Sequence, residues 1–116
     1  MMIVKFYEKR DGEKPVLDFI EGIDEKMQIK VIGVIKLLEE KGSLLREPYS
    51  RKISDGLYEL RARQGSNIVR VLYFFCEGDK AVLTNGFVKK SQKTPRKEIE
   101  TAYRYRRDHL AERNLL

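Results

Sequence analysis

The spacing of apolar residues changes along this chain, and the change limits the folds that the chain can adopt. Between residues 15 and 41 the apolar residues recur every three or four positions, which predicts two helices with one buried stripe each. Asp24 is placed to cap the second helix and Gly42 to end it. From residue 51 the period becomes two, so the segment 57–63 predicts a strand with one buried face.

Turn residues divide the middle of the chain into successive strands. Turns at 64–67 and 77–79 separate the segments 57–63, 68–75 and 80–88, which predicts an antiparallel meander. A short opening strand at 3–7 precedes the helices, and Thr94-Pro95 predicts the start of a last helix, with Thr94 as its cap. The predicted fold is an α/β (α+β) domain over residues 1–116, in the order β-α-α-β-β-β-α.

Positive charge is concentrated in the middle of the chain. The net charge is +6, and residues 48–97 alone carry 11 Lys and Arg against 4 Asp and Glu. A localised basic region favours a polyanion such as RNA or DNA, because neutralising phosphates releases counterions. A solvated surface that keeps the protein in solution is the alternative interpretation.

Several other chemistries lack the residues they need. The single cysteine, Cys76, forms no internal disulfide, and the chain opens without an apolar leader, so we expect a cytoplasmic protein without membrane contact. One histidine and one cysteine give no zinc constellation, and no Gly-rich nucleotide loop is present, so we expect no metal and no cofactor. We expect Cys76 to be a structural thiol and His109 to be solvated.

Candidate site residues lie on the central strands. The alternation places Glu59, Arg61 and Arg63 opposite the apolar side of their strand. Arg70 interrupts an apolar run on the next strand, and an unpaired charge there is costly, so it must reach an anion. That anion is a substrate phosphate in the functional interpretation and the Glu59 carboxylate in the structural one.

A lysine-rich segment joins the last strand to the last helix. Lys89, Lys90 and Lys93 lie just before a helix start, where free amides and the helix dipole favour a phosphate. The alternative is a polar connector with solvated lysines. Together with these cations, further contacts to RNA are expected from Arg51, Lys52, Arg63, Lys89 and Arg96.

The order of these motifs resembles the RelE superfamily of toxins, and within it the HigB-like, phage-derived branch of type II toxin–antitoxin systems. The resemblance runs from about residue 3 to residue 110. It rests on Leu57-Tyr58-Glu59-Leu60-Arg61, Arg70-Val71-Leu72-Tyr73, Phe87-Val88-Lys89-Lys90, and Lys93-Thr94-Pro95 with Glu98, Ile99 and Ala102.

The resemblance implies a twisted antiparallel sheet with helices packed on one side. It implies an endoribonuclease, an mRNA interferase that cuts messages in the ribosome, and a co-encoded antitoxin with a helix-turn-helix domain. On this analogy Arg61 and Arg70 match the family's strand arginines, Lys89 or Lys90 its terminal basic position, and Lys93 a further candidate. The chain departs from the family pattern in three ways. Glu59 stands at a position that tends to be basic in RelE-type members, the basic segment contains no histidine, and no tyrosine follows the last strand at the position seen in those members.

These residues suit RNA cleavage in which the ribose 2′-OH is the nucleophile, so that neither metal nor protein nucleophile is required. Arg61 and Arg70 would stabilise the phosphorane, and Lys90 or Lys93 would transfer protons, with Glu59 as an alternative base. Two alternatives stay open. One is a ParE-like inhibitor of DNA gyrase on the same fold, and the other is a basic nucleic-acid-binding domain without activity.

Overall fold

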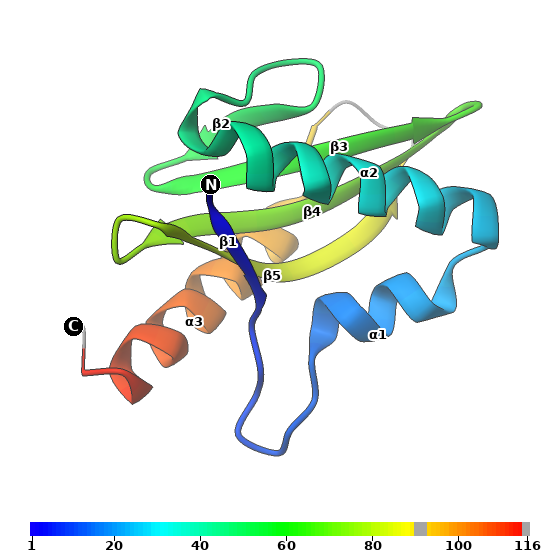
Figure 1. The fold of residues 1–116 in the computed structure, drawn as a ribbon. Coiled ribbons are helices and arrows are strands. Elements are labelled where there is room, and N and C mark those ends of the chain that lie inside the picture. Colours follow the sequence, from blue (N-terminus) through cyan, green and yellow to red (C-terminus); the bar gives the residue numbers. More distant parts are fainter. Residues whose placement is uncertain (90–92, 115–116) are drawn as a thin grey trace.

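The computed structural model describes residues 1–89 and 93–114, and these form an α+β domain (Figure 1). Its elements are β1 (Ile3–Phe6), α1 (Pro15–Gly22), α2 (Glu25–Lys41), β2 (Ser50–Ser54), β3 (Leu57–Gln64), β4 (Asn67–Cys76), β5 (Lys80–Lys89) and α3 (Arg96–Glu112). A short 3-10 turn, Gly42–Leu44, follows α2. The predicted class is confirmed, and the structure adds one strand, β2, that the sequence pattern did not separate from β3.

The strands form one mixed sheet in the order β1-β5-β4-β3-β2. Strands β2 to β5 are antiparallel neighbours, as the turn residues predict. Strand β1 pairs with β5 in parallel, with Ile3 opposite Lys80 and Phe6 opposite Leu83. The expectation of a wholly antiparallel sheet is therefore wrong at this edge. No hairpin joins β1 to β5, so nothing forces the chain to reverse direction between them.

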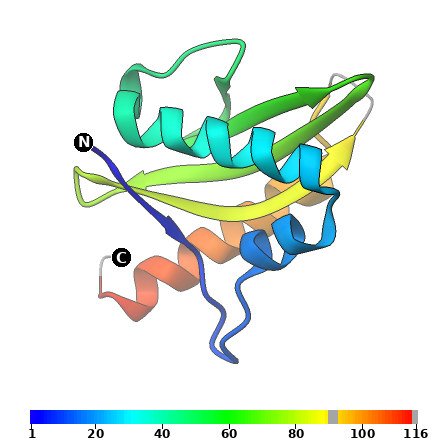
Figure 2. The same ribbon diagram turned by 45° about the vertical axis from the view of Figure 1, so that its right-hand side comes forward.

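Helices cover both faces of the sheet (Figures 1 and 2). Helices α1 and α2 pack on one face, here called the α2 face, and α3 packs on the opposite face, the α3 face. The expectation of helices on one side only is wrong, because β4 is apolar on both of its faces. Its residues Val69 and Val71 join the core under α2, whereas Leu72 and Phe74 join the clusters under α3. A sheet that is apolar on both faces needs cover on both.

The helix ends match the sequence at α2 and differ at α3. The Asp24 carboxylate accepts a hydrogen bond from the backbone N–H of Met27 at 2.9 Å, and Gly42 ends α2 with a positive φ of 54°. At α3 the capping position is Pro95, and no side chain caps the helix. The prediction that Thr94 caps α3 is wrong, because its hydroxyl donates instead to a buried carboxylate, that of Glu59, at 2.8 Å.

The far end of α3 is anchored to the segment after β1. Tyr7 donates a hydrogen bond to Asp108 at 2.6 Å, and its ring stacks on Tyr105 with centroids 4.6 Å apart. Arg10 adds an ion pair to Asp108 at 3.4 Å. These contacts hold the second half of α3 near the β1 side of the sheet, and the first half begins at the connector that follows β5.

Candidate functional site

The side chains of Arg61 and Arg70 share the α3 face of the sheet. The two residues are directly opposite each other in the register of β3 and β4, and side chains of paired residues point to the same face. Glu59 and Arg63, two residues to either side of Arg61, point the same way. Arg61 is half-buried and Arg63 is exposed. The structure thus brings together the strand residues that the sequence analysis selected.

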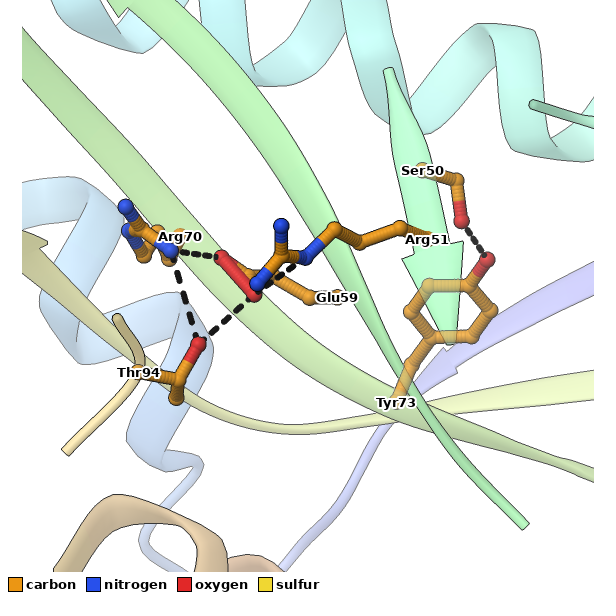
Figure 3. A network of polar contacts seen from close by, with 6 residues as sticks. All are labelled: Ser50, Arg51, Glu59, Arg70, Tyr73 and Thr94. Carbon is orange, nitrogen blue, oxygen red and sulfur yellow. Dashed lines mark hydrogen bonds and ion pairs between the residues drawn. The ribbon is translucent and has the colours of Figure 1, made fainter. Parts of the chain in front are cut away.

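Two members of this group, Arg70 and Glu59, form a buried ion pair (Figure 3). Both side chains are 0% exposed, and Arg70 Nη1 donates to Glu59 Oε1 at 2.7 Å. The Thr94 hydroxyl donates to the other carboxylate oxygen at 2.8 Å, and Arg51 approaches that oxygen to 3.9 Å from β2. The anion that Arg70 reaches in this structure is therefore Glu59, which is the structural interpretation that the sequence left open.

The burial of this pair decides which arginines can meet a ligand. Arg70 has no exposed surface in this arrangement, so it cannot touch a phosphate without a rearrangement of its surroundings. Glu59 is equally enclosed, with Arg51 lying over it as Figure 3 shows. Arg51 and Arg61 are half-buried and Arg63 is exposed, so these three arginines form the accessible part of the group. We call Arg51, Arg61, Arg63 and Arg70 the arginine cluster.

The arginine cluster is electrostatically unbalanced. Burial and then the neighbouring Arg70 cation lower the pKa of the Arg61 guanidinium, Glu59 acts in the opposite direction, and Arg51 and Arg63 lower it further. Arginine keeps its charge even so. The cluster holds four arginines on one face of the sheet, and Glu59, which pairs with Arg70 and lies 3.9 Å from Arg51, is the one carboxylate among these strand residues, so positive charge is in excess. The buried Nε of Arg61 has no hydrogen-bond partner among the described residues. Such a site favours an anion with several acceptor oxygens.

The remaining basic candidates lie in different places. Lys93 is exposed just before Thr94, next to the buried network. Arg96, in the first turn of α3, is 91% exposed and pairs with Glu100 at 3.5 Å. Lys52 follows Arg51 on β2 and is paired with Tyr58 of the α2 face, so its side chain points to the opposite face from the arginine cluster.

Two of the predicted lysines are not fully defined. The backbone of Lys89 ends β5 opposite Ile68, but its side chain is not described. Lys90 lies outside the described residues. Their assignment to a phosphate site stays a prediction.

The sequence analysis missed Tyr49. A cleft of about 220 Å³ beside the arginine cluster is lined by Pro48, Tyr49, Arg61, Arg63 and Ile68. Tyr49 is 44% exposed and continues the alternation of β2 backward from Arg51. That alternation was the available signal, but Pro48 marks the segment as a loop in the sequence.

Among the described residues, no group of three or more His, Cys, Asp and Glu side chains is arranged to hold a metal ion. Burial and then Glu77 raise the pKa of the Cys76 thiol, which fits the predicted structural role. His109 differs from the prediction, because it is half-buried with its ring against Phe74 at 5.9 Å. Burial lowers the pKa of His109. None of the helices in the described ranges combines the length and apolarity that a membrane span needs.

The comparison with family models identifies the class of protein that this fold and basic site define. Residues 18–107 match the family described as Phage derived protein Gp49-like (DUF891). The match covers most of the chain, so the chain belongs to the Gp49-like family, which is known for RelE-like toxins of toxin–antitoxin systems. A toxin of this kind implies an antitoxin partner. The comparison with curated proteins gives no match.

Proposed function

We propose that this protein is the toxin of a type II toxin–antitoxin system and acts as an mRNA endoribonuclease in the cytoplasm. The observation that carries the proposal is the arginine cluster, three of whose members are accessible on the face of the sheet that holds the buried Glu59–Arg70 pair. Family membership supports the role of toxin, and the cluster supports a phosphodiester as the target. In this proposal the target is a message held in the ribosome, and the partner is an antitoxin with a helix-turn-helix domain.

The proposed reaction is an internal transesterification. The ribose 2′-oxygen attacks the adjacent phosphorus, its proton passes to a base, the bond from phosphorus to the 5′-oxygen breaks, and that oxygen receives a proton. The products are a 2′,3′-cyclic phosphate and a 5′-hydroxyl. The dianionic phosphorane gains charge relative to the substrate, so preformed guanidiniums stabilise it more than they stabilise the ground state. This route needs neither metal nor cofactor.

The proposal gives the members of the cluster different roles. Arg61 and Arg63 contact the phosphate, a role that their accessibility on the same strand supports. Arg70 acts as a positioning residue, because it is enclosed and fixes the Glu59 carboxylate. Lys93 or Lys90 transfers the protons. Glu59 can replace them as base only after Arg51 moves aside, because the carboxylate is otherwise covered. Arg96, Lys52 and Lys89 then serve the flanking RNA.

The test compares Arg61→Ala with Arg107→Ala, which removes the same charge from an exposed position far along α3. Arg61→Ala is expected to lower message cleavage by at least about 10²-fold, the effect typical of losing a preformed donor to a transition-state oxyanion. Arg107→Ala is expected to cleave like the parent. Cleavage is read by mapping 5′ ends in expressing cells and on purified ribosomes carrying a defined message.

The outcomes separate the alternatives. Equal cleavage by both variants removes Arg61 from the mechanism. Inhibited gyrase supercoiling without cut messages replaces the nuclease with a ParE-like inhibitor. Tight, salt-dependent RNA binding without cleavage, even with ribosomes, leaves a non-catalytic binding domain.

A further inference from the structure

The cleft beside the arginine cluster contains an aromatic side chain that phosphate chemistry does not use. Pro48, Tyr49 and Ile68 form its apolar part, and Arg61 and Arg63 form its charged part. A site for phosphate alone needs only the cations. The combination of an exposed aromatic ring with guanidiniums matches a nucleotide, which presents a flat base and an anion together.

The backbone fixes the side of the sheet on which Tyr49 lies. The N–H of Arg61 donates to the carbonyl of Tyr49 at 2.8 Å, which extends the pairing of β2 and β3 by one residue beyond Ser50. The hydroxyl of Ser50 meets that of Tyr73, which belongs to the core under α2. Adjacent residues of a strand point to opposite faces, so Tyr49 lies on the same face as Arg51 and Arg61.

The position of Tyr49 is held by the turn before it. The backbone N–H groups of Tyr49 and Ser50 both donate to the carbonyl of Arg46, at 3.1 and 3.2 Å. Both the N–H and the carbonyl of Tyr49 are therefore hydrogen-bonded, which fixes the backbone of this residue. Tyr49 nevertheless stays 44% exposed. Tyr49 and Arg51 are two residues apart on one strand, a separation of about 7 Å. A base on Tyr49 would thus lie about one nucleotide from a phosphate held by the cluster.

We propose that Tyr49 stacks on the base of a nucleotide that flanks the scissile phosphate, and that this cleft is a base-binding subsite. Arg63 borders the subsite, and its guanidinium has five N–H donors, so those not used by the phosphate are available to the base edge. The inference rests on the proposed function, because it names the part of the RNA that this same site recognises. Stacking on a tyrosine ring favours any base, and the residues that line the cleft make some bases bind better than others at this one nucleotide position.

The experiment uses a short RNA with 2-aminopurine beside the cleavage site and a 2′-deoxy sugar at that site, so that the RNA binds without being cut. It is bound to the whole protein, with and without ribosomes. Tyr49→Leu is expected to lose roughly 5- to 150-fold in affinity and the quenching of 2-aminopurine, whereas Tyr49→Phe stays within about twofold of the parent. An abasic nucleotide in place of 2-aminopurine should remove the difference between Tyr49→Leu and the parent.

Two results would overturn the subsite. One is equal binding by the parent and Tyr49→Leu, and the other is an unchanged deficit on the abasic RNA, which would show that the loss is structural. Circular dichroism of both variants checks the fold. Failure of the proposed function is distinguishable: a parent that binds this RNA through Tyr49 but never cuts the all-ribose version refutes the nuclease and keeps the subsite.

Discussion

Replacing Arg70 with methionine tests the interpretation that Arg70 stabilises the fold by forming an ion pair with Glu59. Methionine is long and apolar, so it fills much of the same space but leaves the Glu59 carboxylate buried with Thr94 and with Arg51 at 3.9 Å. Breaking a buried ion pair by removing one partner typically costs about 3–5 kcal/mol. Arg51 can move closer to the carboxylate, so the lower part of this range is expected.

This loss is large against the stability of a small domain. Domains of this size are stable by about 5–15 kcal/mol, so about 3–5 kcal/mol removes a large share of the total. At an unfolding entropy of about 2.1 cal/mol/K per residue, the melting temperature falls by about 12–20 °C. Urea unfolding and a thermal melt measure the two quantities. Arg96→Met is the control, because Arg96 pairs with Glu100 on the surface, and its cost should stay below about 1 kcal/mol.

A double variant separates loss of the pair from loss of arginine packing. In Glu59→Leu, Arg70→Met both charges leave together, and exchange of a buried pair for apolar side chains is often neutral or stabilising. The double variant should therefore recover most of the stability that Arg70→Met loses. The argument is refuted if the double variant is no more stable than Arg70→Met alone, since the coupling energy between the two positions would then be absent.

Three further predictions concern other buried groups. Thr94→Val leaves a Glu59 oxygen without its hydroxyl donor and should cost about 1–3 kcal/mol in urea unfolding, whereas Thr94→Ser should be nearly neutral. Burial and the hydrogen bond to Asp108 raise the pKa of Tyr7, so this tyrosine loses its proton at a lower pH in the unfolded chain than in the folded protein. The free energy of unfolding should therefore fall as the pH rises above about 10. In unfolding experiments from pH 9 to 11, Tyr7→Phe should make that fall shallower. The Cys76 thiol should react slowly with a disulfide reagent at pH 8 and at once in urea, and rapid reaction in the folded protein would contradict its burial.

Much of the fold could be predicted from patterns among residues that are close together in the sequence. The helical stripe of α2 and its caps at Asp24 and Gly42 depend on residues close together in the chain, and the structure confirms them. The paired hairpins of β3, β4 and β5 also depend on short turns. The packing of α3 on its own face of the sheet was harder to predict. Strand β4 has two apolar faces, and the local pattern does not say on which of them a helix distant in sequence packs.

The candidate site shows the same division. Alternation along β3 placed Glu59, Arg61 and Arg63 together, because side-chain direction in a strand is a local property. The burial of Arg70 and the hydrogen bond from Thr94 to Glu59 depend on tertiary contacts. Thr94 and Glu59 are 35 positions apart, and no local sequence pattern predicts that they meet. Tyr49 was missed for a related reason, since its exposure depends on how the turn before β2 meets β3.

The edge position of β2 has a consequence for solubility. An outermost strand offers unpaired backbone groups along its free side and invites another chain to add to the sheet. Here that strand carries Arg51 and Lys52 and has a bulge between Lys52 and Ser54, and both features discourage such addition. Positive charge at this border thus helps to keep copies of the protein apart, and neutralising it would promote self-association.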